Sequence, residues 1–382
     1  MSWPNNRLTQ LLGIDYPLIQ APMAGGMTTP ELVAAVSNAG GLGSLGAGYM
    51  KPEAIRQAIM AIRQRTDQPF AVNLFVSEPM KEEAQRVISA NRLLAPYREA
   101  LNLPEPEPLL SAVADYTEEL TVSLEDSSEM WVSTGPNYNE QIAVVLEEGV
   151  DIISFTFGIP CDTEIETFKK RGITTMGTAT HVLEGILLEE IGIDVVVAQG
   201  MEAGGHRGTF IGTAEQGLWS LMTLIPVLVD QIQIPVVAAG GIMDGRGIAA
   251  AHHLGAAGVQ MGTAFLTTPE SGAHPMYKRA LLDNTEMSTV LTKVFSGKLA
   301  RGLNNRFIAE LSEAADQLPG YPIQNALTRD IRRAAAEHDM PELMSLWAGT
   351  GCALCQSKPV AELMRQWLEH AAQRIRYPSG GH

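Results

Sequence analysis

Short apolar runs recur along the chain, and each is followed by a stretch with the signals of a helix. The eight runs rich in β-formers are 18–20, 43–45, 70–75, 152–155, 173–176, 195–199, 236–239 and 259–261. Their residues are continuously apolar rather than alternating, which is typical of parallel strands that are buried on both faces. Eight strand-and-helix units predict an α/β fold, a (β/α)8 TIM barrel of about 250 residues.

Capping residues support this division of the chain. Thr29-Pro30-Glu31 and Lys51-Pro52-Glu53 each place a proline at a first helical position, and Asp244 is a good N-cap. Gly40 and Gly255 follow helical segments, where glycine commonly ends a helix. The predicted helices therefore begin and end between the predicted strands.

Two segments lie outside the eight units. Residues 77–137 are rich in acid, leucine and proline, and we interpret them as a helical insertion with a stiff linker at 103–108. Residues 267–349 do not return at once to a barrel helix, so we predict a smaller substrate or lid domain at the carboxyl face. The sequence thus predicts a barrel over 1–266, this lid over 267–349 and a final barrel helix within 350–382.

Composition points to small-molecule ligands. The chain has 382 residues, 45% of them hydrophobic, and a net charge of −16, which argues against nucleic acid or an anionic membrane as the main partner. The N-terminal residues lack the pattern of a secretion signal, and no apolar run reaches the roughly 18 residues of a membrane span. We therefore expect a cytoplasmic protein.

The residues at the predicted strand ends suit a neutral polar ligand. In a parallel barrel the catalytic face lies at the carboxyl ends of the strands. Those ends are rich in amides and glycines and poor in carboxylates, which fits a heterocycle recognised by hydrogen bonds better than a metal. They comprise the segment 20–26, Asn73, Gln199, Gly240 with Gly241, and Gln260 to Thr263.

Glycines after the seventh and eighth strands fit a phosphate site. Loops at these two places often bind phosphate in such barrels, through backbone N–H groups and here the Thr263 hydroxyl. The alternative is that Gly240, Gly241 and Gly262 only form tight turns. The pattern Gly41-x-Gly43-x-x-Gly46 matches a dinucleotide fingerprint, but a helix precedes it and the predicted strand lies inside it, so its context is wrong.

One histidine lies in a glycine-rich loop directly after a strand. His206 belongs to the segment Gln199 to Gly208, and imidazole titrates near neutrality, at about 6.5 when unperturbed. The position favours acid-base catalysis, whereas the alternative is a structural histidine bonded to backbone. Glu202 and Arg207 either orient this histidine or are simply solvated.

The three cysteines give no sign of a disulfide framework or a metal site. Cys352 and Cys355 have the spacing of a redox pair, but no second pair completes a set of metal ligands. We interpret them as small unreactive side chains and predict no metal.

Several long motifs resemble, in order, the nitronate monooxygenases of the first class, FMN enzymes formerly called 2-nitropropane dioxygenases. The motifs span residues 20–26, 72–75, 154–158, 199–208, 239–247, 258–265, 295–302 and 346–349. The resemblance implies oxidation of alkyl nitronates such as propionate 3-nitronate, and of nitroalkanes, by O2 to carbonyl compounds and nitrite through a flavin semiquinone. It also implies that His206 is the active-site histidine, which a neutral nitroalkane would need as a base and a nitronate would not.

The same resemblance implies how FMN is held. The expected flavin contacts are Pro22, Met23, Ala24 and Asn73, with Gln199 and Gly204 near the ring system. The expected phosphate contacts are Gly240, Gly241, Gln260, Met261, Gly262 and Thr263. Lys298, Tyr321 and Trp347 are further candidates for the substrate pocket.

Other functions share the same barrel. An NADH:quinone reductase or an enoyl reductase would use the same FMN site, and a non-enzymatic FMN-binding module would use it without turnover. The expected partners are a small nitronate or nitroalkane and O2, with no nucleic acid and no membrane. A homodimer is one possible assembly.

Overall fold

The computed structural model describes residues 3–76, 80–104, 120–124, 129–134, 138–283 and 289–376. The stiff linker expected at 103–108 lies mostly outside the described residues.

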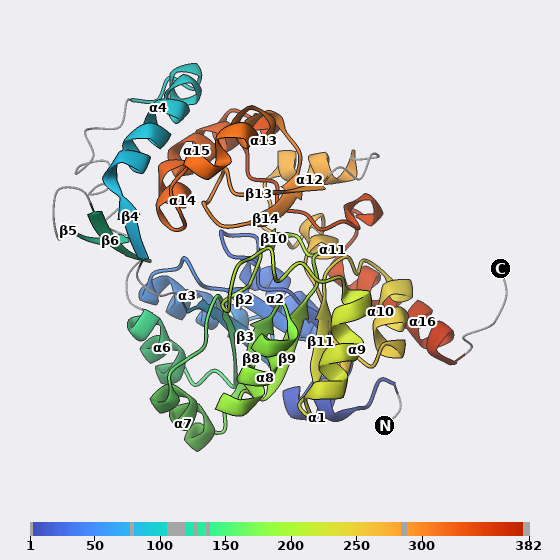
Figure 1. Cartoon of the computed structure of the whole chain (residues 1–382). Helices are drawn as coiled ribbons and strands as arrows, with labels where there is room; N and C mark the ends of the chain where they lie inside the picture. The colour runs from blue at the N-terminus through green and yellow to red at the C-terminus, as the bar shows by residue number, and fades with distance from the viewer. Residues whose placement is uncertain are drawn as a thin grey trace.

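Eight parallel strands form a nearly closed barrel, which confirms the predicted fold (Figure 1). Their order around the sheet is β1-β12-β11-β9-β8-β7-β3-β2. A parallel bridge between Ile19 and Leu42 joins the two edges, and the N–H of Gln20 donates to the carbonyl of Leu42 at 2.9 Å. The strands are β1 Leu18–Gln20, β2 Gly43–Gly46, β3 Phe70–Phe75, β7 Ile152–Thr156, β8 Thr174–Ala179, β9 Val195–Gln199, β11 Val236–Ala239 and β12 Gly258–Met261.

Helices cover the outside of the barrel, one after each strand. Thr29 caps the first of them by accepting from the N–H of Leu32, and Asp244 caps α10 by accepting from the N–H of Arg246, as predicted. Helix α16 packs against α10 and α2, and so closes the helical layer between the last strand and the first. The helices are α2 Pro30–Asn38, α3 Pro52–Arg63, α6 Tyr138–Glu147, α7 Asp162–Arg171, α8 Val182–Ile191, α9 Leu221–Gln231, α10 Gly245–His253 and α16 Val360–Arg376.

A short helix covers the amino end of the barrel. In α1 (Arg7–Leu12) the side chains of Leu8 and Leu12 are buried with the inward-facing residues of the strands. The amide of Asn6 donates to the carbonyl of Ala257, directly before β12. With this end covered by apolar side chains, the opposite, carboxyl end is the one open to a ligand.

The insertion after β3 contains strands as well as a helix. Helix α4 (Ala84–Ala100) agrees with the helical insertion that the sequence predicts. The sequence analysis missed a three-stranded antiparallel sheet, β4-β6-β5, formed by Met80–Glu83, Glu129–Thr134 and Leu120–Leu124. The described part of this insertion therefore contains both kinds of secondary structure.

A second unit stands over the carboxyl ends of the strands. Its sheet has the order β10-β14-β13, and β10 (Gly205–His206) pairs antiparallel with β14. The loop that carries His206 is thus a strand of this unit. Its other elements are α11 Thr263–Leu266, α12 Pro275–Leu282, β13 Thr289–Thr292, β14 Ala300–Leu303, α13 Arg306–Leu311, α14 Ile323–Leu327, α15 Arg329–Glu337 and the 3-10 helices 312–317, 341–343 and 352–354.

Helix α4 packs onto this second unit, and the two together are called the cap. Val87 and Leu94 of α4 belong to the same buried cluster as Phe307 and Ile331, and Figure 1 shows α4 beside α14 and α15. Arg98 of α4 is buried, and its Nε lies 2.7 Å from a carboxylate oxygen of Asp330 on α15. Segments that are far apart in the sequence thus share one hydrophobic core above the barrel.

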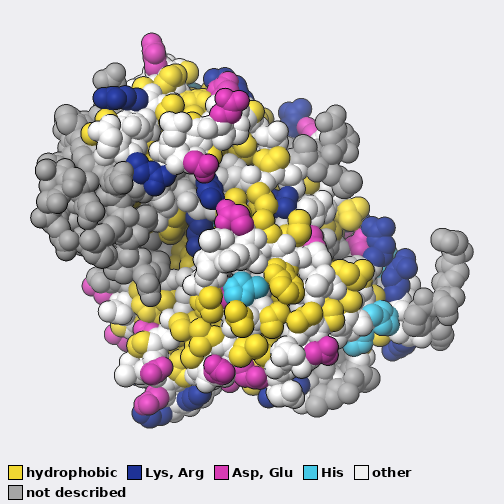
Figure 2. Space-filling view, in the orientation of Figure 1, with side chains coloured by type: hydrophobic (Ala, Val, Ile, Leu, Met, Phe, Trp, Pro, Cys, Tyr) yellow, Lys and Arg dark blue, Asp and Glu magenta, His cyan; other side chains and the backbone are white. Residues whose placement is uncertain are grey.

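The outer face of α8 and α9 is largely apolar (Figure 2). Leu183 and Met222, near the amino ends of these two helices, are 64% and 71% exposed. In the part of the chain that the structure describes, no helix is long and apolar enough to cross a membrane.

Candidate active site

A cavity of about 520 Å³ lies between the carboxyl ends of the strands and the cap. This volume is in the usual range of sites for cofactors and small molecules. All thirteen residues predicted for the site line it: Pro22, Met23, Ala24, Asn73, Gln199, Gly204, His206, Gly240, Gly241, Gln260, Met261, Gly262 and Thr263.

The charged side chains of the cavity are basic. Arg329, Arg332 and Arg333 on α15 line its cap side, and no described lining residue is an aspartate or a glutamate. A neutral barrel floor with cationic groups above it favours an anionic ligand over a metal cation.

Glycines let several backbone segments converge at the cavity. Gly240 and Gly241 have φ of 137° and 65°, values that suit glycine. A Cβ on Gly240 would lie 2.9 Å from the nitrogen of Ala203, and a Cβ on Gly204 would lie 2.5 Å from the nitrogen of Gly349. The close packing of these loops around the cavity therefore depends on glycine at these positions.

Two of the predicted amides already have protein partners. Asn73 donates through Nδ2 to the hydroxyls of Ser154 at 3.0 Å and Thr156 at 3.2 Å. Gln199 donates through Nε2 to the carbonyl of His206 at 3.0 Å and accepts through Oε1 from the N–H of Gly208 at 2.8 Å. The Gln199 side chain thus holds the histidine loop as well as lining the cavity.

His206 is fixed at its ring by Ser296. Nε2 of the imidazole lies 2.8 Å from Oγ of Ser296, and that hydroxyl donates to the carbonyl of Lys298 at 3.1 Å. Because a serine hydroxyl has one proton, this arrangement places the imidazole proton on Nε2 and leaves Nδ1 as the acceptor. The ring of Trp347 lies 5.2 Å from that of His206, and the ring of Tyr321 lies 6.0 Å away.

The surroundings of His206 hold it in the neutral form. Burial, and then the positive charges of Lys298 and Arg332, lower the pKa of His206 to about 3. The sequence analysis expected an imidazole that titrates near neutrality, so the structure corrects this expectation. At neutral pH the ring is an uncharged and weak proton acceptor.

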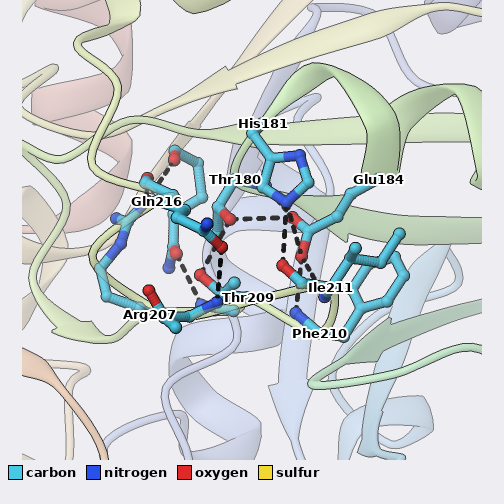
Figure 3. Close-up of polar contacts among 12 residues, drawn as sticks. Thr180, His181, Glu184, Arg207, Thr209, Phe210, Ile211 and Gln216 are labelled. Carbon is cyan, nitrogen blue, oxygen red and sulfur yellow. Dashed lines mark hydrogen bonds and ion pairs between the residues drawn. The ribbon is translucent and has the colours of Figure 1, made fainter.

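Two buried charges hold the loop that carries His206 (Figure 3). The Glu184 carboxylate accepts from the N–H groups of Phe210 and Ile211 at 2.6 and 2.9 Å, and from the hydroxyl of Thr180 at 2.8 Å. The Arg207 guanidinium donates to three carbonyls, those of Gln199, Gly200 and Gly217. Both groups bond mainly to backbone, which fixes the loop on either side of the histidine.

Neither neighbour that the sequence suggested for orienting His206 is bonded to its ring. Arg207 is fully buried rather than solvated, and Glu202 accepts from the N–H of Leu221 at 3.1 Å, at the start of α9. Ser296, which does hold the ring, was not singled out in the sequence. It belongs to the motif 295–302, the only signal that could have identified it.

The sequence analysis also missed several residues that line the cavity. Tyr49 and Phe157 lie just beyond the carboxyl ends of β2 and β7, but the search of strand ends considered amides and glycines and passed over aromatic side chains. Phe157 belongs to the motif 154–158, which could have identified it. The three arginines lie on α15, away from any strand end. Of the three further candidates, Trp347 lines the cavity, Tyr321 lies beside His206, and Lys298 places Nζ 4.6 Å from the ring centre of Phe157.

The cysteines lie outside the lining of the cavity. Cys352 is buried, and burial raises the pKa of the Cys355 thiol to about 12, so that this thiol is not a nucleophile at neutral pH. Within the described ranges no group of His, Cys, Asp and Glu side chains could hold a metal ion.

Comparisons of this chain with known proteins all indicate the same family. The family model described as nitronate monooxygenase matches residues 5–370. A probable nitronate monooxygenase of Staphylococcus saprophyticus is 47% identical over 96% of this chain and 98% of its own length.

Two solved structures share the whole fold. A nitroalkane oxidase from Streptomyces ansochromogenes has a TM-score of 0.84 and 37% identity, and the match covers 98% of this chain and 100% of that one. FabK from Thermotoga maritima is more distant, with a TM-score of 0.74 and 30% identity over 98% of both chains. The chain therefore belongs to the nitronate monooxygenase family, a family of flavin-dependent oxidoreductases.

Proposed function

We propose that this protein binds FMN in the cavity and oxidises alkyl nitronates with O2 to carbonyl compounds and nitrite. The observation that carries the proposal is the cavity itself, where the thirteen predicted residues meet beneath three arginines. A nitronate is an anion, and a cavity with cationic but no acidic described lining residues suits it.

The glycine floor fits a flavin mononucleotide. A Cβ at Gly204 or Gly240 would meet the backbone of a neighbouring loop, so these glycines let the loops pack together around the space that the ligand would occupy. The residues that would contact the ring system are Pro22, Met23, Ala24, Asn73, Gln199 and Gly204. Those that would hold the phosphate are Gly240, Gly241, Gln260, Met261, Gly262 and Thr263.

The protein's own groups bind and orient the substrate. When bound, FMN supplies the electron-transfer chemistry between nitronate and O2. The cap covers the carboxyl face, and we propose that its part 267–349 is the lid that faces substrate and excludes water from the cavity. The ring of Trp347 and the imidazole of His206, in contact with each other, form one wall.

The low pKa of His206 suits a nitronate better than a neutral nitroalkane. A nitroalkane must lose its α-proton first, and general bases with a pKa near the working pH contribute about 10² to 10⁴ fold. An imidazole whose pKa is about 3 is too weak a base at neutral pH to provide most of this rate increase. A nitronate is already deprotonated, so it needs only to be positioned beside the ring.

Oxygen uptake with ethyl nitronate and no NADH tests this function, with nitrite measured in the same samples. We expect uptake, and we expect kcat/KM for ethyl nitronate to exceed that for nitroethane by at least about 100-fold, because an effective base is lacking. Because His206 is too weak a base to assist nitroethane, the variant His206→Asn should lower nitroethane and nitronate turnover by similar factors, through loss of positioning. A much larger loss with nitroethane than with nitronate would instead show that His206 acts as the base.

The same samples distinguish the rival functions. Rapid bleaching of the bound flavin by NADH, followed by quinone reduction, would identify a reductase. A yellow protein that consumes no oxygen with nitronate and is not reduced by NADH would identify a binding module. Either result would overturn the proposed oxidation.

A further inference from the structure

Phe157 has a strained backbone at the edge of the cavity. Its φ is 76°, in the left-handed region that bulky side chains rarely adopt. Among described residues the other non-glycine examples are Asn102 and Asp339, which follow helices and belong to residue types that tolerate this conformation. Such strain persists where the surrounding structure fixes the backbone, and it is common at functional sites.

The chain on both sides of Phe157 is fixed against strand β3. The carbonyl of Thr156 accepts from the N–H of Val76 at 2.9 Å. A Cβ on Gly158 would lie 2.8 Å from the carbonyl oxygen of Val76, so this glycine packs directly on the neighbouring chain. The backbone at Phe157 therefore has little freedom to relax, and the direction of its side chain is set.

The ring of Phe157 is enclosed by both the barrel and the cap. Its centre lies 4.7 Å from that of Phe75 and 6.0 Å from that of Tyr321. Nζ of Lys298 lies 4.6 Å from the ring centre, close enough for a cation–π contact. The ring also meets His206 edge-on, with centres 6.1 Å apart, in a T-shaped contact.

We propose that Phe157 is a specificity-determining residue that limits the size of the alkyl group on the nitronate carbon. Because its ring touches His206 and lines the cavity, a substrate positioned at the imidazole has its alkyl group against this ring. Phe75, Tyr321 and Lys298 prevent the ring from turning away. The inference rests on the proposed function for the identity of the substrate.

The test compares Phe157→Gly and Phe157→Leu with the wild type. Glycine removes the ring and accepts a φ of 76° without strain, whereas leucine keeps a smaller apolar side chain. The measured quantity is the ratio of kcat/KM for hexyl nitronate to that for ethyl nitronate. Phe168→Leu is the matched control, because Phe168 is fully buried outside the cavity.

We expect the ratio to rise by at least about tenfold in Phe157→Gly, since a pocket discriminates about 10 to 200 fold for one methylene. Phe157→Leu should show a smaller rise, and Phe168→Leu should keep the wild-type ratio. An unchanged ratio in both Phe157 variants would overturn the proposal, as would an equal rise in the control.

Calorimetry can measure the affinities for butyrate and octanoate without any turnover. It therefore tests the inference about Phe157 independently of the proposed function. These carboxylates resemble nitronates in charge and shape but are not oxidised. If the wild type consumes no oxygen with ethyl nitronate, the proposed function fails. A tenfold gain in relative octanoate affinity in Phe157→Gly would still support the size limit, and no gain would overturn it.

Discussion

His206 shows how one side chain takes its chemistry from distant parts of the chain. Its place in a glycine-rich loop after a strand could be predicted from neighbouring residues alone. Its pKa could not, because Lys298 and Arg332 belong to the cap, and burial depends on the whole cavity. The sequence therefore predicted that His206 lies at the cavity but not that its pKa is lowered.

The lowered pKa of His206 makes folding stability depend on pH. Between its ordinary value of about 6.5 and the folded value of about 3, the unfolded chain binds a proton that the folded chain does not. This contribution is fully present above pH 6.5 and is lost as the pH falls toward 3. We expect the free energy of urea unfolding to fall more steeply from pH 6.5 to 5 in the wild type than in His206→Asn.

The wild type and His206→Asn share every other titrating group. The difference between their pH dependences of unfolding therefore reports the titration of His206. The expected difference in slope corresponds to as much as about one proton. Parallel curves over this range would show that His206 titrates normally in the folded protein.

The elements of the barrel follow from the sequence far more directly than those of the cap. Apolar runs such as Val195–Gln199 match buried parallel strands, and capping residues mark the helices between them. Strand β4 has the sequence Met-Lys-Glu-Glu, whose residues favour helices, and only its pairing with β6 makes it a strand. Local preference therefore failed where long-range pairing decides the structure.

A buried ion pair between Arg98 and Asp330 adds to the apolar contacts that hold helix α4 on the cap. Nη2 of Arg98 also donates to the carbonyl of Leu327 at 2.6 Å. The side chain of Arg98 is 2% exposed and that of Asp330 is 25% exposed. We expect Arg98→Met to lower the free energy of unfolding by about 2–4 kcal/mol, because it leaves a partly buried carboxylate without its partner.

The test is to compare the free energies of urea unfolding of Arg98→Met and of a control, Arg365→Met. Arg365 pairs with Glu369 on the surface of α16, where both side chains are more than half exposed. Such exposed pairs contribute about 0–1 kcal/mol, so the control should stay close to the wild type. Equal effects of the two substitutions would show that Arg98 does not fasten α4 to the cap.

At the scale of the whole molecule, the site lies between two hydrophobic cores, that of the barrel and that of the cap. The strand ends could be predicted to converge because parallel strands in a barrel all end at one face. The contributions of the cap could not, since no periodicity relates α4, β10 and α15 to one another. The arginines of α15 were therefore beyond what the sequence pattern specifies.

The composition of the cap core predicts that residues 267–349 do not fold alone. Val87, Leu94 and Tyr97 of α4 complete that core, and β10 of the barrel loop completes its sheet. An isolated 267–349 fragment would expose these apolar surfaces to water. We expect the circular dichroism of the fragment to show no cooperative thermal transition and that of the full chain to show one. A cooperative transition in the fragment would mean that the segment is an independent domain.

Helix α16 also bears on the order in which the protein is made. It fills the gap between α2 and α10, and it follows the cap in the chain. During synthesis, segments emerge from the amino end onward and fold as they become able to. The ribosome therefore completes the cap before the layer of helices around the barrel is closed, and the nascent chain exposes the apolar surface between α2 and α10 until α16 emerges.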